Sequence, residues 1–200
     1  MKFLELNKKR HAYRRFNDKE VDVKDIRTAI EIASLAPSAN NVQPWKFVIV
    51  KEKKDQLADL MYSTNRDQGL AAQYVIAIFS DSDLAQRARK VARIGVKDLP
   101  DDQIGYFMET LPPRFAAFSE EDTSIFQAFN TGLVTMNLAL ALTDQGFASN
   151  IIAGFDKSKV NEILDIDSRF RPEILVTVGY SDEKPEPSYR LPVDNIIEMR

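Results

Sequence analysis

The chain has 200 residues, of which 44% are hydrophobic, and its formal net charge is -3. This length and apolar content suffice for one compact domain with its own core, so we expect residues 1–200 to form a single domain. The lack of cysteine excludes disulfides and thiolate chemistry, and a single histidine excludes a multi-histidine metal centre. The acidic balance argues against attraction of the whole surface to nucleic acid or to an anionic membrane.

The N-terminal sequence MKFLELNKKR lacks the apolar segment and small-residue cleavage site of a secretory signal. We expect no segment to approach the run of about 20 apolar residues that crosses a bilayer. These two features predict a cytoplasmic protein.

The first predicted elements are two helices. A short helix over Lys2–Lys9 is expected to turn Phe3 and Leu4 toward a core, and a basic cluster follows it. The segment after Asp22 reads as an amphipathic helix, because Asp22 is a favourable N-cap and apolar residues recur on one face. Pro37 is expected to stop this second helix.

Three runs of β-branched and aromatic residues predict strands. They cover 45–51, Gln73–Phe79 and Ile174–Tyr180. A short helix is expected over Lys54–Tyr62, and a charged helix from about Leu84. Alternating strands and helices predict a mixed α and β class with three layers around one sheet.

The longest apolar run extends from Thr123 to Gln145 and predicts a long helix that Gly146 ends. Apolar residues occupy nearly all sides of this helix. A helix of that kind must be covered all round, so it is either a central core helix or part of a dimer interface.

Three separated segments combine cationic or amide side chains with turn formers: RHAYRRF at 10–16, APSANNVQPWKF at 36–47 and SYRLP at 188–192. A guanidinium matches phosphate oxygens with two parallel hydrogen bonds. On a helical turn, Arg10 and Arg14 would share one face. The alternatives are a solvated basic surface with weak ion pairs and an ordinary helix-to-strand loop.

Taken together, these segments resemble the FMN-dependent nitroreductase family. Arg10 to Phe16 is similar to the family's R-R-S-x-R-x-F element, and Ala36 to Phe47 is similar to its loop A-P-S-S-x-N-x-Q-P-W-x-F. Asn65 and Gln68 match an amide-bearing segment before the second core strand. The glycine segment 152–155 and the C-terminal S-x-R-L-P at 188–192 complete five matches in the family's order.

The resemblance implies an α+β class, a three-layer α/β/α fold with one central, mostly antiparallel sheet, and a homodimer. A C-terminal segment is expected to extend onto the partner subunit. The loop at Ser38, Ala39 and Asn41 is expected to reach the flavin that the other subunit holds. Assembly and FMN binding would therefore be linked.

The resemblance also assigns positions around FMN. Arg10 and Arg190 are expected at the phosphate, and Arg14 near the N1 and O2 edge, where a fixed cation favours the reduced anion. Asn65 and Gln68 are expected at the pyrimidine edge. The predicted FMN-binding residues are Arg10, His11, Ala12, Arg14, Pro37, Ser38, Ala39, Asn41, Asn65, Gln68, Ile152, Ala153, Gly154 and Arg190.

The sequence departs from the family pattern at three positions. Ala12 and Ala39 replace the usual serines, and Ser188 stands where several members have a phosphate-facing lysine. These changes remove polar contacts, so the retention of FMN during purification is in question.

The activity implied is transfer of hydride from NADH or NADPH through flavin N5 to a small electron-poor acceptor, by ping-pong kinetics. Nitroaromatics, quinones and dihydropteridines are candidate acceptors. No catalytic side chain and no metal are expected. The alternatives are a flavin-binding or storage protein without turnover and a nucleic-acid or membrane module using the basic N-terminal cluster.

Two further groups have both a functional and a structural interpretation. His11 either works as an acid or base or packs beside FMN, and packing is favoured. The aromatic residues Tyr106, Phe107, Phe115 and Phe118 either roof a pocket or belong to the core.

Overall fold

The computed structural model describes residues 2–200 and contains one four-stranded sheet in the order β1-β2-β4-β3. The strands are β1 (Trp45–Val50), β2 (Tyr74–Asp81), β3 (Ala148–Ile152) and β4 (Phe170–Gly179). Each neighbouring pair is antiparallel. The expected mixed class is confirmed, and the sheet is antiparallel throughout.

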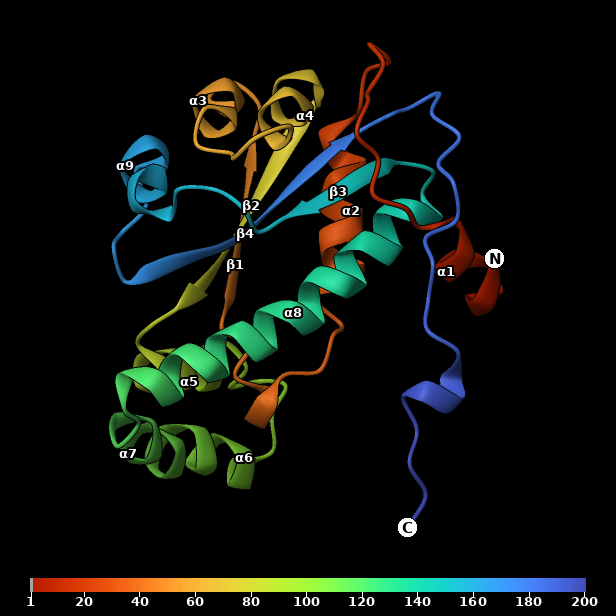
Figure 1. Ribbon diagram of the computed structural model, residues 1–200. Helices are drawn as coiled ribbons and strands as arrows, with labels where there is room; N and C mark the ends of the chain where they lie inside the picture. The colour runs from red at the N-terminus through yellow and green to blue at the C-terminus, as the bar shows by residue number, and fades with distance from the viewer. Residues whose placement is uncertain (1) are drawn as a thin grey trace.

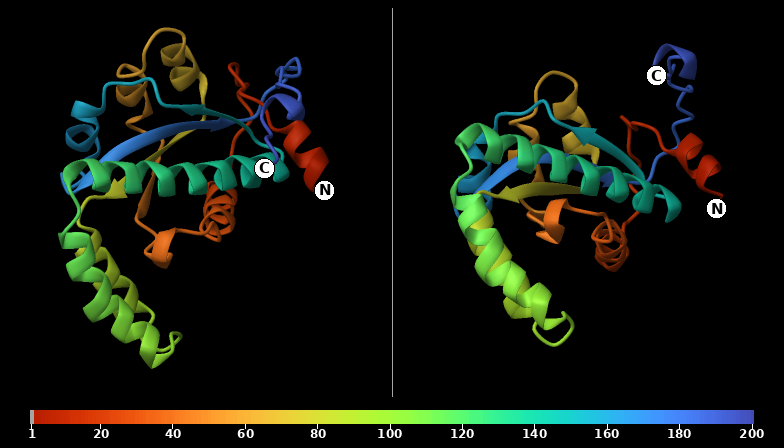
Figure 2. Two further views of the ribbon diagram at one scale, coloured as in Figure 1. Left: turned by 60° about the horizontal axis from the view of Figure 1, so that its bottom comes forward. Right: turned by 90° about the horizontal axis from the view of Figure 1, so that it is seen from below.

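Helices cover both faces of this sheet (Figures 1 and 2). The helices are α1 (Phe3–Lys9), α2 (Val23–Ala33), α3 (Lys54–Ala58), α4 (Asn65–Ala71), α5 (Leu84–Ile94), α6 (Asp101–Gly105), α7 (Leu111–Ala116), α8 (Glu120–Asp144) and α9 (Val160–Leu164). Helices α2 and α8 lie on one face, and α3, α4 and α9 on the other. The three-layer architecture is therefore confirmed.

Side chains on the two faces of β2 pack into two separate cores, because successive side chains of a strand point in opposite directions. Ile76 and Ile78 pack with residues of α2 and α8. Val75, Ala77 and Phe79 pack with residues of α3 and α9. Burial on both faces explains why this strand reads as a continuous apolar run.

Helix α8 runs across the sheet for 25 residues. It begins with a capping box in which Ser119 and Asp122 bond each other's backbone N–H, and the Ser119 hydroxyl lowers the pKa of Asp122. Val134 and Leu138 face the core, whereas Ile125 and Phe129 are 62% and 59% exposed. The helix thus joins the core with one face and leaves an apolar stripe uncovered on the other.

The expectation that no segment could span a bilayer is wrong for α8 when length and composition alone are counted. Its best 18-residue window has a mean hydropathy of 1.4, and half of that window is buried inside the structure. Core helices meet the same criterion, and the packing of α8 on the sheet identifies it as one.

An arm of helices α5, α6 and α7 projects away from the sheet (Figure 2). A third core, which includes Ala88, Phe107, Leu111 and Phe115, holds it together. Val42, from the loop after α2, is fully buried in this core. The arm and that loop therefore form one packed unit.

Several predicted elements differ from those observed. No residue of α1 is buried, and Phe3 and Leu4 are exposed, so the expected contact of α1 with a core is wrong. Asp22 caps α2 as predicted, but the helix ends at Ala33, ahead of Pro37. The helix expected over Lys54–Tyr62 stops at Ala58.

Gly69 in α4 leaves no room for a side chain. A Cβ at this position would lie 2.8 Å from both Ala58 Cβ and Met61 Sδ. We expect Gly69→Ala to destabilise the protein by about 1–3 kcal/mol through overpacking, although alanine favours helix. Gly105→Ala is the control, because a Cβ there meets nothing within 4 Å. Urea denaturation measures both, and equal stability of the two variants would contradict the packing argument.

Candidate functional site

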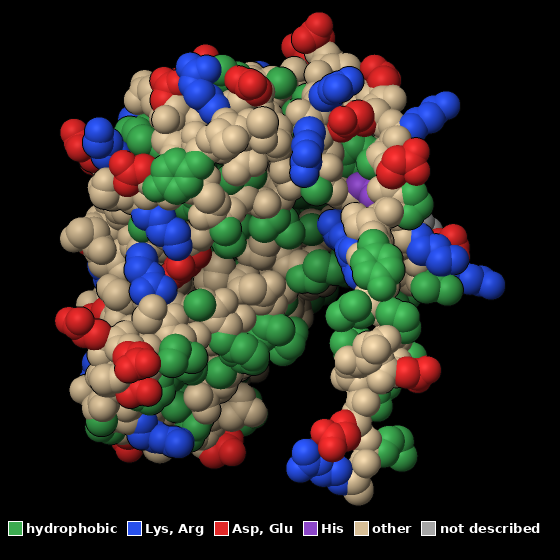
Figure 3. Space-filling view, in the orientation of Figure 1, with side chains coloured by type: hydrophobic (Ala, Val, Ile, Leu, Met, Phe, Trp, Pro, Cys, Tyr) green, Lys and Arg blue, Asp and Glu red, His purple; other side chains and the backbone are tan. Residues whose placement is uncertain are grey.

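A cavity of about 640 Å³ lies between the end of α1 and the C-terminal segment. Its lining residues are Asn7, Lys8, Arg10, His11, Met136, Pro187, Ser188 and Arg190. The volume lies within the range of small-molecule sites. Figure 3 shows the single histidine in a recess beside the C-terminal segment. Residues from opposite ends of the chain therefore build one cavity.

The lining of this cavity is cationic and contains no carboxylate. Within residues 2–200, neither Arg10 nor Arg190 forms an ion pair. Arg190 Nη1 donates only to the neighbouring Tyr189 carbonyl, at 2.8 Å. Uncompensated guanidinium groups that share a cavity favour an anion, above all phosphate.

The turn that follows Arg10 is held against β3 and the C-terminal segment. Tyr13 N donates to Ser149 O at 3.2 Å. The backbone N–H groups of Arg14 and Arg15 donate to Glu183 Oε2 at 2.9 and 3.2 Å. Because α1 ends at Lys9, Arg10 and Arg14 do not share a helical face, and that expectation is wrong. The Glu183 side chain instead binds the backbone of the turn, and Arg14 is exposed.

A second group consists of amide side chains. Gln68, only 3% exposed, accepts a hydrogen bond from Asn150 Nδ2 of β3 through Oε1. Its Nε2 lies 3.5 Å from Asn65 Oδ1. A Cβ on Gly154 would lie 3.6 Å from Asn65 Nδ2, so this glycine adjoins the amide group. The sequence reasoning missed Asn150, because β3, with the sequence ASNII, is short and half polar and carries no motif at this position.

The backbone of the segment 152–154 lies next to this group of amide side chains. Ile152 is 2% exposed, and its side chain belongs to the second core. Ala153 is exposed and Gly154 half-buried. The Gly154 carbonyl accepts from Tyr62 N at 3.0 Å, which ties the segment to the start of α4.

The loop over 38–43 is a third group and lies apart from the cavity, next to the helical arm (Figure 1). Ser38 Oγ accepts from Gln43 N at 2.9 Å, and Ala39 N donates to Asn130 Oδ1 of α8 at 2.8 Å. Pro37 and Asn41 are exposed. The sequence reasoning missed Asn130, which is fully buried.

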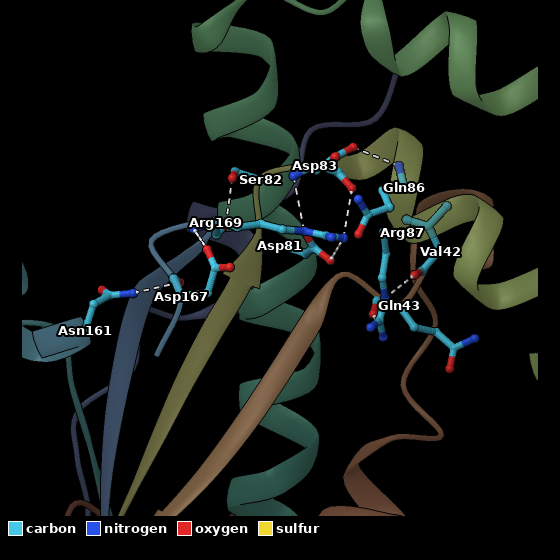
Figure 4. Close-up of polar contacts among 10 residues, drawn as sticks. All are labelled: Val42, Gln43, Asp81, Ser82, Asp83, Gln86, Arg87, Asn161, Asp167 and Arg169. Carbon is cyan, nitrogen blue, oxygen red and sulfur yellow. Dashed lines mark hydrogen bonds and ion pairs between the residues drawn. The ribbon is translucent and has the colours of Figure 1, made fainter. Parts of the chain in front are cut away.

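A charged network stands behind this loop (Figure 4). Asp81, 1% exposed, accepts from Arg169 Nε and Nη2 at 2.6 and 2.7 Å, and this bond raises the pKa of Arg169. Arg87 donates to the carbonyls of Val42 and Gln43. Burial lowers the pKa of Arg87, against the opposing attraction of Asp81.

The structure therefore brings the predicted residues together in three places rather than in one cavity of a single chain. Arg10, His11 and Arg190 share the cationic cavity. Asn65, Gln68 and Gly154 adjoin one another. Ala12 and Arg14 lie on the turn near the cavity, and Pro37, Ser38, Ala39 and Asn41 lie on the separate loop.

Some aromatic residues of the arm belong to the core, and others contact the loop or line a pocket. Phe107 and Phe115 are buried in the third core, as the structural alternative requires. Tyr106 donates through its hydroxyl to Asn40 Oδ1 at 3.0 Å, and so contacts the loop. Phe118 lines a shallow pocket with Phe126 and Phe129.

Comparison with known proteins shows to which family the chain belongs. The model of the nitroreductase family matches residues 8–180. The chain belongs to the nitroreductase family. A Streptococcus pyogenes protein named "Putative NAD(P)H nitroreductase" is 70% identical over the full length of both chains. A Bacillus subtilis protein of the same designation is 30% identical, over 99% of this chain and 97% of its own.

Solved nitroreductase-family structures share the fold. A nitroreductase family protein from Streptococcus pneumoniae is 64% identical, covers both chains completely and superposes with a TM-score of 0.98. A structure from Exiguobacterium sibiricum, solved in complex with FMN, is 23% identical, covers 100% of this chain and 98% of its own, and has a TM-score of 0.90. Family membership supports an oxidoreductase.

Proposed function

We propose that this nitroreductase-family protein is an FMN-dependent oxidoreductase that uses NADH or NADPH to reduce a small electron-poor acceptor. The observation that carries the proposal is the cationic cavity, in which Arg10 and Arg190, from opposite ends of the chain, form no ion pair with any residue of 2–200. The names of the relatives and the FMN in one structure of the same fold support it. The proposal treats 1–200 as one FMN-binding domain.

The residues of the cavity fit the phosphate of FMN. Arg10 and Arg190 would bind its oxygens, each through a charge-assisted hydrogen bond. His11 would pack beside the cofactor, since no carboxylate in the cavity lining orients it as an acid or base. Ser188 also lines the cavity and offers a hydroxyl where other members have a lysine.

The amide group fits the ring system. When bound, FMN supplies hydride acceptance from NAD(P)H and hydride donation to the acceptor. Asn65 and Gln68 would hydrogen-bond the pyrimidine edge, and the contact from Asn150 holds the Gln68 amide in place. The backbone of Ala153 and Gly154 would lie against the ring, because glycine allows close approach. Arg14 would hold positive charge near the edge that becomes anionic on reduction.

The site is completed by a second subunit in this proposal. The loop with Ser38, Ala39 and Asn41 lies apart from the cavity of its own chain, as a loop that serves the partner's cavity must. The exposed stripe of Ile125, Phe129 and Met136 supplies an apolar face for the partner. Exposed apolar residues of the C-terminal segment, which extends away from the body, would cover the partner as well; they are Leu191, Val193, Ile196, Ile197 and Met199.

The proposed activity is tested with protein purified after expression in FMN-supplemented medium. We expect flavin absorbance in the visible blue, and we expect anaerobic NADH or NADPH to bleach it. Addition of a quinone should then restore the absorbance. A flavin that stays oxidised with both nucleotides would favour storage without turnover, and a protein that binds no FMN would exclude both functions.

The phosphate assignment is tested with Arg190→Ala. We expect the dissociation constant for FMN to rise by about 10- to 100-fold, because a hydrogen bond to a charged group contributes about 1.5–3 kcal/mol. Titration of the apoprotein with FMN, followed by flavin fluorescence, measures this change. Arg27→Ala is the control, since Arg27 is exposed on α2 and lies outside the cavity. Unchanged affinity in Arg190→Ala would remove Arg190 from the phosphate site.

The proposed dimer is tested by light scattering at micromolar concentration. We expect the mass of two chains, because the α8 stripe and the C-terminal segment leave large apolar side chains in water otherwise. Phe129→Glu should shift the mass to one chain and weaken FMN binding in parallel. Lys24→Glu on α2 is the control for the added charge. A monomeric wild-type protein that still binds FMN would contradict a shared site.

A further inference from the structure

The loop over 38–43 adopts a backbone conformation that is unfavourable by itself. Asn40, Asn41 and Gln43 have positive φ angles of 54°, 52° and 47°. For residues other than glycine this region costs about 1–2 kcal/mol each, although asparagine tolerates it better than most. Such a conformation persists only where surrounding contacts determine it.

Arg87 of α5 contacts the loop backbone from outside the loop. Its Nε donates to Val42 O at 3.2 Å, and its Nη2 donates to Gln43 O. The planar fork of the guanidinium thus binds two consecutive carbonyls at once. A lysine ammonium, as a point donor on a flexible stem, would not reproduce this geometry.

The neighbouring ion pair explains why Arg87 donates to carbonyls of the loop and not to a carboxylate. The buried carboxylate of Asp81, whose charge acts on Arg87, is occupied by the two bonds from Arg169 (Figure 4). Arg87 therefore forms no ion pair within residues 2–200, and it bonds carbonyl oxygens instead. The backbone N–H of Asp81 also donates to Pro44 O at 2.7 Å, which fixes the end of the loop to β2.

Two other contacts hold the loop from different sides. Asn130 of α8 binds Ala39 N, and the Tyr106 hydroxyl of the arm binds Asn40 Oδ1. Of these three side chains, Arg87 is the one that binds the carbonyls of Val42 and Gln43, within the strained part of the loop. Loss of Arg87 would leave the carbonyls of Val42 and Gln43 without these donors, while the other contacts of the loop remain.

We propose that Arg87 is a positioning residue that acts on the flavin of the partner subunit: it fixes the loop over 38–43 so that Ser38, Ala39 and Asn41 meet that flavin. The inference rests on the proposed function, because the loop faces a flavin only if the site is shared. Arg87 itself touches no cofactor in this proposal. Its effect on FMN passes through the loop backbone and across the dimer.

The first measurement is FMN binding to apoprotein of Arg87→Gln, followed by flavin fluorescence. We expect the dissociation constant to rise about tenfold, the lower end of the change for a lost charged hydrogen bond, because Arg87 acts on FMN only through the loop. Arg171→Gln is the matched control, because Arg171 bonds Glu173 and Ser124 rather than the loop. A general loss of stability would weaken FMN binding equally in both variants and would overturn the proposal. Arg87→Lys should recover only part of the affinity.

The decisive experiment pairs two differently tagged subunits, Arg87→Gln and Arg190→Ala, in one heterodimer purified over both tags. If Arg87 acts across the dimer, both defects fall in one site and the other site is intact. We then expect one tightly bound FMN per dimer, although neither homodimer binds FMN tightly. If Arg87 acts within its own subunit, both sites are damaged and no tight FMN is bound, which overturns the proposal.

Failure of the underlying function is distinguishable, because wild-type protein would then bind no FMN at all. If Arg87→Gln does not fold, Tyr106→Phe replaces it in the same heterodimer. This change removes one hydroxyl contact to Asn40 at the surface and leaves the carbonyl contacts in place. We expect a smaller loss of affinity that is restored in one site per heterodimer. Wild-type FMN affinity in the Tyr106→Phe homodimer would overturn the proposal in that case.

Discussion

Two guanidinium groups that share a cavity without a carboxylate repel each other, and this constraint organises the proposed site. Arg10 and Arg190 line the same cavity, and neither forms an ion pair within residues 2–200. The half-buried Arg169, by contrast, is paired with the carboxylate of Asp81. This difference supports the proposal that a ligand supplies the counter-charge in the cavity.

The fold places this cavity at the edge of a rigid body. β3 lies at one edge of the antiparallel sheet and contacts both groups: the Ser149 backbone carbonyl accepts from Tyr13 N of the Arg10–Arg15 turn, and the Asn150 side chain donates to Gln68 of the amide group. One short strand thereby connects the cationic cavity with Gln68 and sets the spacing between them.

The main elements of the fold could be predicted from the sequence because their signals are local. β1, β2 and the part of β4 from Ile174 are rich in β-branched and aromatic residues, and Asp22 caps α2. β3 was missed because ASNII is short and half polar, and α4 because its sequence NRDQGLA has little apolar periodicity. Helix α1 was assigned to a core because an apolar residue in a short helix does not reveal whether anything covers it.

Only those residues of the candidate site that belong to a sequence motif could be predicted. The resemblance named Arg10 and Arg190, and the structure places both in one cavity. It could not name Asn150, Asn130 or Arg87, because each acts through a contact with a residue far away in the sequence. Such partners are determined by the tertiary fold, and a single asparagine or arginine carries no pattern that identifies them.

The separation of the 38–43 loop from the cavity has an energetic consequence for assembly. A monomer would hold a strained loop with no ligand to contact and a cationic cavity open to water. A dimer would bring the loop of each chain to the cavity of the other, and FMN would then bind both subunits at once. By linkage, any ligand that binds the dimer more tightly than the monomer stabilises the dimer to the same extent. In the proposed dimer, the order of the loop, the subunit contact and FMN binding would therefore be terms of one equilibrium, and a change at Arg87 would shift all three.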